Sequence, residues 1–198
     1  MRMRNPKDKD ELLNGCDYYY EGSFENNNPV CLEIGMGKGQ FILNMALNNP
    51  NVNYIGVEKY SSVASVAIKK INEYKPSNLK VLIGDIASIE DLLDNKIDTI
   101  YLNFSDPWPK NRHEKRRLTS SYFLKKYDDI FKGEKKIFQK TDNIGLFAYS
   151  VESLSCYGYT LKNVTMDLKD LEDNVMTEYE KKFISKNVKI CRLEAYKK

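Results

Sequence analysis

A turn containing three glycines separates a buried strand from a helix near the start of the chain, and this unit constrains the fold most strongly. Val30–Ile34 is predicted as the strand, and the helical spacing of apolar residues predicts a helix over Gln40–Asn48. Gly35, Gly37 and Gly39 lie between them. Glycine allows a tight turn and lets backbone N–H groups approach a ligand closely. The unit is typical of the opening of a nucleotide-binding α/β domain.

The rest of the chain repeats the alternation of strand and helix. Further strands are expected at Asn53–Glu58, Leu79–Ile83, Ile97–Phe104, Lys135–Lys140, Tyr159–Thr165 and Val188–Tyr196. Helices are expected at Asp10–Leu13, Ser61–Tyr74, Ala87–Leu93, Thr119–Phe131 (with Thr119 as N-cap), Ile144–Cys156 and Thr177–Lys186. This order predicts an α/β fold with a mainly parallel sheet covered on both faces. Residues 1–28 are interpreted as an N-terminal arm and 29–198 as one domain.

Composition excludes several classes of protein. With 198 residues, 41% of them hydrophobic and 30% charged, the chain is expected to form one soluble domain. No apolar run approaches the roughly 18 residues of a membrane-spanning helix, and the charged start lacks the apolar part of a signal peptide. The four cysteines are scattered and there is one histidine. We therefore expect a cytoplasmic protein with no metal site and no membrane partner.

Three acids, Glu33, Glu58 and Asp85, stand at the carboxyl ends of three successive predicted strands. In an open α/β sheet this edge forms the ligand crevice. Glu33 would repel a pyrophosphate but could pair with the amino-acid ammonium group of S-adenosylmethionine. Glu58 would then take the ribose hydroxyls and Asp85 would read the adenine. Because of Glu33 and the G-x-G-x-G spacing, an NAD-dependent dehydrogenase is disfavoured.

The predicted strand Ile97–Phe104 ends abruptly at the sequence Ser-Asp-Pro-Trp-Pro, residues 105–109. Each proline fixes its own φ and restricts the residue before it, so Asp106 and Trp108 are held in a stiff turn. Asp106 is expected to face the crevice. Trp108, the only tryptophan, could be a core residue or could contact a base.

A basic run follows that turn, although the net charge of the chain is only +3. Residues 110–117 contain five Lys or Arg and one Glu, a density that favours contact with phosphates over a merely solvated face. His113 within the run is expected to be a polar contact, not a general base. Two more features lie further along. Asp142 follows the fifth strand, and Thr177 and Glu180 have capping-box spacing, which by itself indicates only a helix start.

Several motifs together resemble the bacterial tRNA (guanine-N7-)-methyltransferases: LEIGMGKG (32–39), GVE (56–58), GDI (84–86), LNFSDPWPKNRHEKRRL (102–118), TDN with LFAYS (141–150) and TEYEKKF (177–183). The resemblance implies a class I, Rossmann-like methyltransferase fold with a seven-stranded, mostly parallel sheet whose last strand is antiparallel. It implies methyl transfer from S-adenosylmethionine to N7 of a guanosine in the variable loop of tRNA.

The resemblance also assigns roles to residues. It implies cofactor binding by Glu33, Gly35, Gly37, Glu58, Asp85 and Asp106, with Asp106 also counted as the catalytic, active-site acid. It implies substrate binding by Lys110, Asp142, Thr177, Glu178, Tyr179 and Glu180, and RNA binding by Arg112, His113, Glu114, Lys115, Arg116 and Arg117.

Two alternatives stay open at this point. Methyltransferases of exocyclic amino groups carry a related turn after the fourth strand, but their Pro-Pro-aromatic core is absent here. A non-catalytic RNA-binding protein could keep a degenerate methyltransferase fold, although the intact glycines and acids argue against it. The sequence does not distinguish a monomer from a homodimer.

Overall fold

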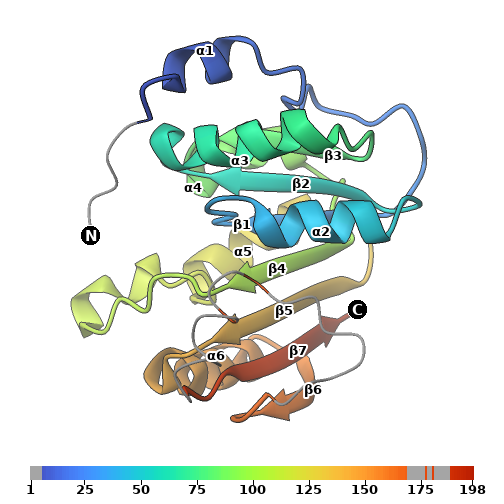
Figure 1. Ribbon diagram of the computed structural model, residues 1–198. Helices are drawn as coiled ribbons and strands as arrows, with labels where there is room; N and C mark the ends of the chain where they lie inside the picture. Colours follow the sequence, from blue (N-terminus) through green and yellow to red (C-terminus); the bar gives the residue numbers. More distant parts are fainter. Residues whose placement is uncertain (1–5, 169–176, 178–179, 181–187) are drawn as a thin grey trace.

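A seven-stranded sheet forms the centre of the protein in a computed structural model that describes residues 6–168, 177, 180 and 188–198 (Figure 1). The strands are β1 (Val30–Ile34), β2 (Asn53–Glu58), β3 (Leu79–Ile83), β4 (Thr99–Asn103), β5 (Lys135–Thr141), β6 (Thr160–Thr165) and β7 (Cys191–Lys197). The helices are α1 (Lys9–Asn14), α2 (Gln40–Asn48), α3 (Ser61–Tyr74), α4 (Ile86–Ile89), α5 (Ser121–Ile130) and α6 (Ile144–Cys156), with 3₁₀ turns η1 (Glu90–Leu93) and η2 (Asn111–Arg116). Within these described ranges, no helix is long and apolar enough to cross a membrane.

The strands follow the order β3-β2-β1-β4-β5-β7-β6. β1 to β5 run parallel to one another, whereas β7 runs antiparallel to both β5 and β6. The expected mostly parallel sheet with an antiparallel last strand is thereby confirmed. The chain runs outward from β1 to β3 and then returns to place β4 beside β1. The direction of strand order therefore reverses between β1 and β4, where α/β sheets bind ligands.

Helices cover both faces of the sheet. On one face, α2 and α3 bury Ile42, Leu43, Ala67 and Ile71 against Cys31 and other residues of β1 to β3. The opposite face carries α5 and α6, which pack Leu124, Phe147 and their neighbours against Leu32, Ile100 and Ile137 of the sheet. Successive side chains of a strand point to opposite faces of the sheet. The apolar layers under the two helix pairs are therefore built from adjacent positions of the same strands.

The described part of the N-terminal arm lies along the β3 edge of the sheet. The amide of Tyr20 donates to the carbonyl of Val81 at 3.0 Å, and the amide of Val81 donates to the carbonyl of Tyr18 at 2.7 Å. Tyr20 is buried, and α1 packs against α3. Pairing of this kind satisfies backbone groups that an edge strand would otherwise expose.

Several element boundaries differ from the expectation. Thr119 was expected to be the N-cap of α5, but α5 begins at Ser121 and Ser120 takes the N-cap position. The hydroxyl of Thr119 lies instead 2.7 Å from the hydroxyl of Ser150 in α6. β4 and β7 are shorter than predicted. The single helix expected at Ala87–Leu93 is divided into α4 and the 3₁₀ turn η1. Most of the predicted helix over 177–186 lies outside the described residues.

Candidate active site

Five acids predicted for the site lie at the same edge of the sheet. Glu33 precedes the end of β1 by one residue and Glu58 ends β2. Asp85, Asp106 and Asp142 come shortly after β3, β4 and β5. The carboxyl ends of these five parallel strands share an edge, from which the segment after β4 projects outward (Figure 1). The candidate site is built on this edge.

The glycine turn is left-handed at all three glycines, with φ of 79° at Gly35, 57° at Gly37 and 72° at Gly39. A Cβ atom added to Gly35 or Gly37 would meet no atom within 4 Å, so open space lies beside this backbone. A Cβ on Gly39 would lie 2.8 Å from the Cβ of Ala67 in α3. The first two glycines therefore leave room for a ligand, and the third lets α2 pack closely against α3.

Glu58 ties the glycine turn to the beginning of α3. Its Oε2 accepts a hydrogen bond from the Gly37 amide at 3.0 Å, and its Oε1 accepts one from the Tyr60 amide at 2.9 Å. The side chain is buried. A carboxylate has about four lone-pair positions, so these two bonds leave capacity for the hydroxyls of a ribose.

Glu33 is a buried acid with one oxygen that lacks a hydrogen-bond partner. Its Oε1 accepts from the side-chain amide of Asn103 at 2.9 Å, whereas its Oε2 has no partner among the described residues. Burial raises the pKa of Glu33 to about 8, against the opposing effects of Asn103 and the nearby Lys140 cation. A buried carboxyl group of this kind suits a cationic ligand group, which would satisfy Oε2 and favour the ionised form.

Asp85 forms an exposed ion pair with Lys59 at 2.8 Å, and its other oxygen accepts from the Ala87 amide at 3.1 Å. The bond from Lys59 is the main cause that lowers the pKa of Asp85. Lys59 was missed by the sequence analysis because a lone lysine after Glu58 carries no pattern. The role of Asp85 in reading adenine stays a prediction.

The turn after β4 is held by the basic segment that follows it. Phe104 and Trp108 adopt left-handed backbone conformations, with φ of 51° and 41°. Such conformations cost non-glycine residues about 1–3 kcal/mol and persist where the surroundings enforce them. The Arg117 guanidinium donates from Nε and Nη2 to the carbonyl oxygen of Trp108, at 3.2 and 3.1 Å. Trp108 is half-buried, so it is not a core residue, and the Arg116 guanidinium lies 4.8 Å from its ring centre.

The six residues predicted to bind RNA are placed differently from one another. Arg117 lies 4.3 Å from the ring centre of Tyr149 in α6, and the Tyr149 hydroxyl donates to Glu114 at 2.9 Å. His113 meets the edge of the Trp108 ring. The remaining three, Arg112, Lys115 and Arg116, are exposed. Arg117 therefore stabilises the turn and packs on α6. The sequence pattern did not distinguish it from the exposed cations of residues 110–117.

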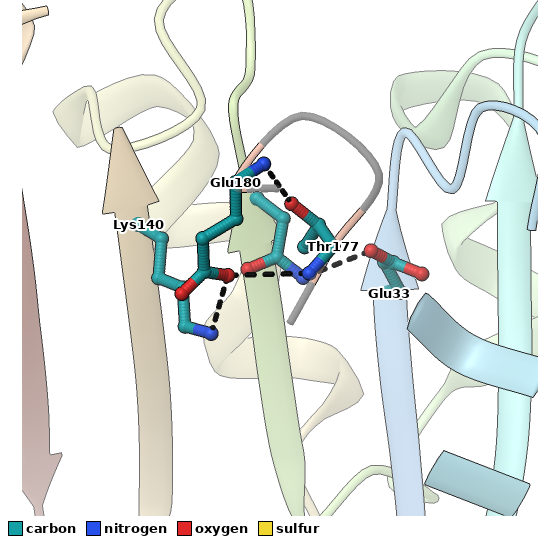
Figure 2. A network of polar contacts seen from close by, with 5 residues as sticks. Glu33, Lys140, Thr177 and Glu180 are labelled. Carbon is teal, nitrogen blue, oxygen red and sulfur yellow. Dashed lines mark hydrogen bonds and ion pairs between the residues drawn. The ribbon is translucent and has the colours of Figure 1, made fainter. Parts of the chain in front are cut away.

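Of the predicted substrate-binding residues, Thr177 and Glu180 are described, whereas Glu178 and Tyr179 lie outside the described residues. The Glu180 amide donates to the Thr177 hydroxyl at 2.9 Å, and the Thr177 amide donates to Glu180 Oε2 at 3.2 Å. This is the capping box that the spacing predicts. The same Oε2 receives the ammonium of Lys140, 3.0 Å away, from β5 (Figure 2).

The other two predicted substrate-binding residues, Lys110 and Asp142, lie after β4 and β5. Lys110 is exposed and Asp142 is half-buried. Sequence reasoning missed Asn103 and Lys140, which line the same edge. The available signal was their position: each was the last or next-to-last residue of a predicted strand. In the part of the chain that the structure describes, no group of three or more His, Cys, Asp or Glu could hold a metal ion.

Comparison with known proteins places this chain in a family. A family model described as "Putative methyltransferase" matches residues 27–193. The tRNA (guanine-N(7)-)-methyltransferase of Lachnoclostridium phytofermentans is 47% identical over 100% of this chain and 99% of its own. The chain belongs to the tRNA (guanine-N7-)-methyltransferase family. The Bacillus licheniformis member of that family is 52% identical, over 87% of this chain and 82% of its own.

Solved structures agree on the fold. A structure described as that of an antibiotic related methyltransferase aligns with a TM-score of 0.62 over 99% of this chain and 96% of the other. The two sequences are 20% identical, so this likeness shows the fold alone. The tRNA (guanine-N7-)-methyltransferase family member described here thus has the architecture of S-adenosylmethionine-dependent methyltransferases.

Proposed function

We propose that this protein transfers a methyl group from S-adenosylmethionine to N7 of a guanosine in the variable loop of tRNA. The observation that carries the proposal is the relation to tRNA (guanine-N7-)-methyltransferases over nearly the full length of both chains. The geometry of the sheet edge supports it, because the acids and glycines expected for such an enzyme lie there together.

The described residues fit the proposed cofactor. Glu33 offers a buried oxygen that lacks a partner among the described residues, which suits the amino-acid ammonium group. Gly35 and Gly37 leave open space beside the backbone, Glu58 can accept from the ribose hydroxyls, and Asp85 stands beside the next strand end. When bound, S-adenosylmethionine supplies an electrophilic methyl group. Asp106 is proposed to contribute to this cofactor site as well.

The chain's own residues are proposed to position the guanine. N7 carries a free lone pair and is an acceptor in the major groove, so no base is needed to deprotonate it. The protein's task is then mainly proximity and alignment. We propose that Asp106 and Asp142 accept hydrogen bonds from the N1–H and amino groups of the guanine. Lys110, four residues after Asp106, would meet the attached phosphates.

The exposed cations after β4 are proposed to hold the RNA backbone. Arg112, Lys115 and Arg116 project from the edge that carries Asp106. Phosphate contacts there would fix the register of the tRNA while the target nucleotide leaves its stack to reach the site.

A methylation assay on bulk tRNA, followed by mass spectrometry of the nucleosides, tests this function. The expected product is N7-methylguanosine, formed only when S-adenosylmethionine is present. A guanosine methylated on its exocyclic amino group would instead support the alternative enzyme class. Cofactor binding with no methylated nucleoside from any tRNA preparation would count against the proposed reaction.

A further inference from the structure

A row of buried and half-buried polar side chains crosses the sheet at the candidate site. Glu33, Asn103 and Lys140 come from β1, β4 and β5, which are neighbours in the sheet, and Asn103 pairs with Lys140 in register. Asn103 donates to Glu33. Figure 2 shows Lys140 reaching Glu180. Glu33 belongs to the proposed cofactor site, whereas Glu180 belongs to the segment expected to bind the substrate. The row therefore joins two functional parts that are far apart in the sequence.

Lys140 is the member of this row that holds the capping box against the sheet. Its ammonium lies 3.0 Å from Glu180 Oε2, the oxygen that also accepts from the Thr177 amide. The side chains of Lys140 and Glu180 are only 11% and 1% exposed. A buried carboxylate needs a paired cation, because an isolated buried charge is strongly unfavourable.

The same ammonium faces the cofactor side of the site. It lies 5.7 Å from the ring centre of Phe41, in the first turn of the helix that follows the glycine turn. Its positive charge also acts on Glu33, where it opposes the rise in pKa that burial causes. One lysine thus stands among the glycine-turn helix, the acid proposed to hold the cofactor, and the capping box.

We propose that Lys140 is a positioning residue that fixes the Thr177–Glu180 box over the cofactor site and thereby sets how well the enzyme uses tRNA. This inference rests on the proposed function. Lys140 itself need not touch either substrate, because its effect passes through Glu180. The ion pair would hold the box in register with β5, from whose carboxyl end Asp142 also reaches the site.

Two variants separate positioning from folding. Lys140→Met removes the cation but keeps a side chain of similar length. In Lys140→Met/Glu180→Gln the capping box no longer holds a buried carboxylate without its cation, and glutamine can still close the box. Lys136→Met is the matched control, because Lys136 lies on the same strand and the same face but pairs with Glu134 at the surface.

We expect Lys140→Met and the double variant to lower kcat/KM for tRNA at least thirtyfold, while the Kd of S-adenosylhomocysteine changes less than fivefold. The double variant should keep a melting temperature near that of the wild type and the Lys136→Met control. Equal losses in tRNA use and cofactor affinity would overturn the inference, as would a double variant with kcat/KM within twofold of wild type.

Amide hydrogen exchange supplies a readout that needs no tRNA. The Thr177 and Glu180 amides both donate within the box, so their exchange should be at least tenfold faster in Lys140→Met than in Lys136→Met. Unchanged exchange would overturn the inference. If the wild type fails to produce N7-methylguanosine, the proposed function fails, and these exchange rates still decide whether Lys140 holds the box.

Discussion

The Arg117 guanidinium donates two hydrogen bonds to the carbonyl oxygen of Trp108, so the end of the basic segment holds the turn that carries Asp106. We expect Arg117→Met to lower kcat/KM for tRNA roughly tenfold or more, because the turn loses the contacts that set its geometry. Arg117→Lys should not restore activity, since lysine cannot reproduce the fork of two N–H donors. Steady-state kinetics would check both, and full activity of Arg117→Lys would contradict the fixed-turn explanation.

Arg112 and Lys115 should behave differently from Arg117, because both are exposed on the projecting segment. Neutralising them is expected to weaken tRNA binding and to reduce the slope of log K against log salt by about one per lost phosphate contact. Binding titrations at several salt concentrations measure this slope. A slope that stays the same would place the RNA contact elsewhere, while Arg117→Met should leave it nearly unchanged.

Cofactor binding should depend on pH through Glu33. Burial raises the pKa of Glu33 to about 8, so the free protein holds this carboxyl protonated at neutral pH. A bound ammonium group favours the ionised form, so binding should release a proton and become tighter as pH rises from about 6 to about 8. Calorimetry in buffers of different ionisation enthalpy counts the proton. Binding that is independent of pH, with no proton released, would show that the cation does not meet Glu33.

The same pKa predicts an effect on stability. Because the folded-state pKa of Glu33 lies above the unfolded value, the folded protein binds more protons between pH 4.5 and about 8. The contribution of Glu33 to stability should therefore be fully present below pH 4.5 and decline as pH rises toward 8. In Glu33→Gln this decline should disappear while cofactor affinity falls. Denaturant unfolding at several pH values, without cofactor, would reveal it.

Asp106 should matter for turnover far more than for folding. Its side chain is exposed at the carboxyl edge, so Asp106→Ala should change the free energy of unfolding by less than about 0.5 kcal/mol. We expect kcat to fall about 100-fold or more if the carboxylate positions the guanine. Asp106→Asn is the matched control for size. A small loss of turnover with cofactor binding intact would remove Asp106 from the centre of the mechanism.

The third glycine of the turn should be needed for stability, not only for binding. Gly39→Ala would place a Cβ 2.8 Å from that of Ala67 and put alanine at φ 72°, so we expect a loss of about 2–4 kcal/mol. Adding Ala67→Gly should recover part of that loss by removing the facing methyl group. Thermal unfolding of the single and double variants tests this. Equal stability of both would show that only the backbone strain matters.

Much of this fold follows from local patterns in the sequence. Short apolar runs bounded by clear breaks predict β1, β2 and β3, and the 3.6-residue spacing of apolar residues predicts α2 and α3, all with the bounds observed. Thr119 was misassigned because a hydroxyl before a helix has the same local pattern whether it caps the helix or pairs with Ser150.

The contacts within the site could not be predicted in the same way. Asn103 donates to Glu33 and Lys140 pairs with Glu180, contacts between residues that are 70 and 40 positions apart. A single sequence contains no period or spacing that encodes such a meeting. The acids at the strand ends were accessible to sequence reasoning only because parallel strands always share a carboxyl edge.

The position of β7 between β5 and β6 has a consequence for the order of assembly during synthesis. β6 is made before β7, yet in the sheet it pairs with β7. It therefore has to wait beside the nascent domain until a later segment leaves the ribosome and inserts between the two strands. Thr177 and Glu180 lie in the connection between β6 and β7, so this connection is anchored at both ends only after that insertion. The ion pair between Lys140 and Glu180 is thus expected to be among the last contacts of the domain to form.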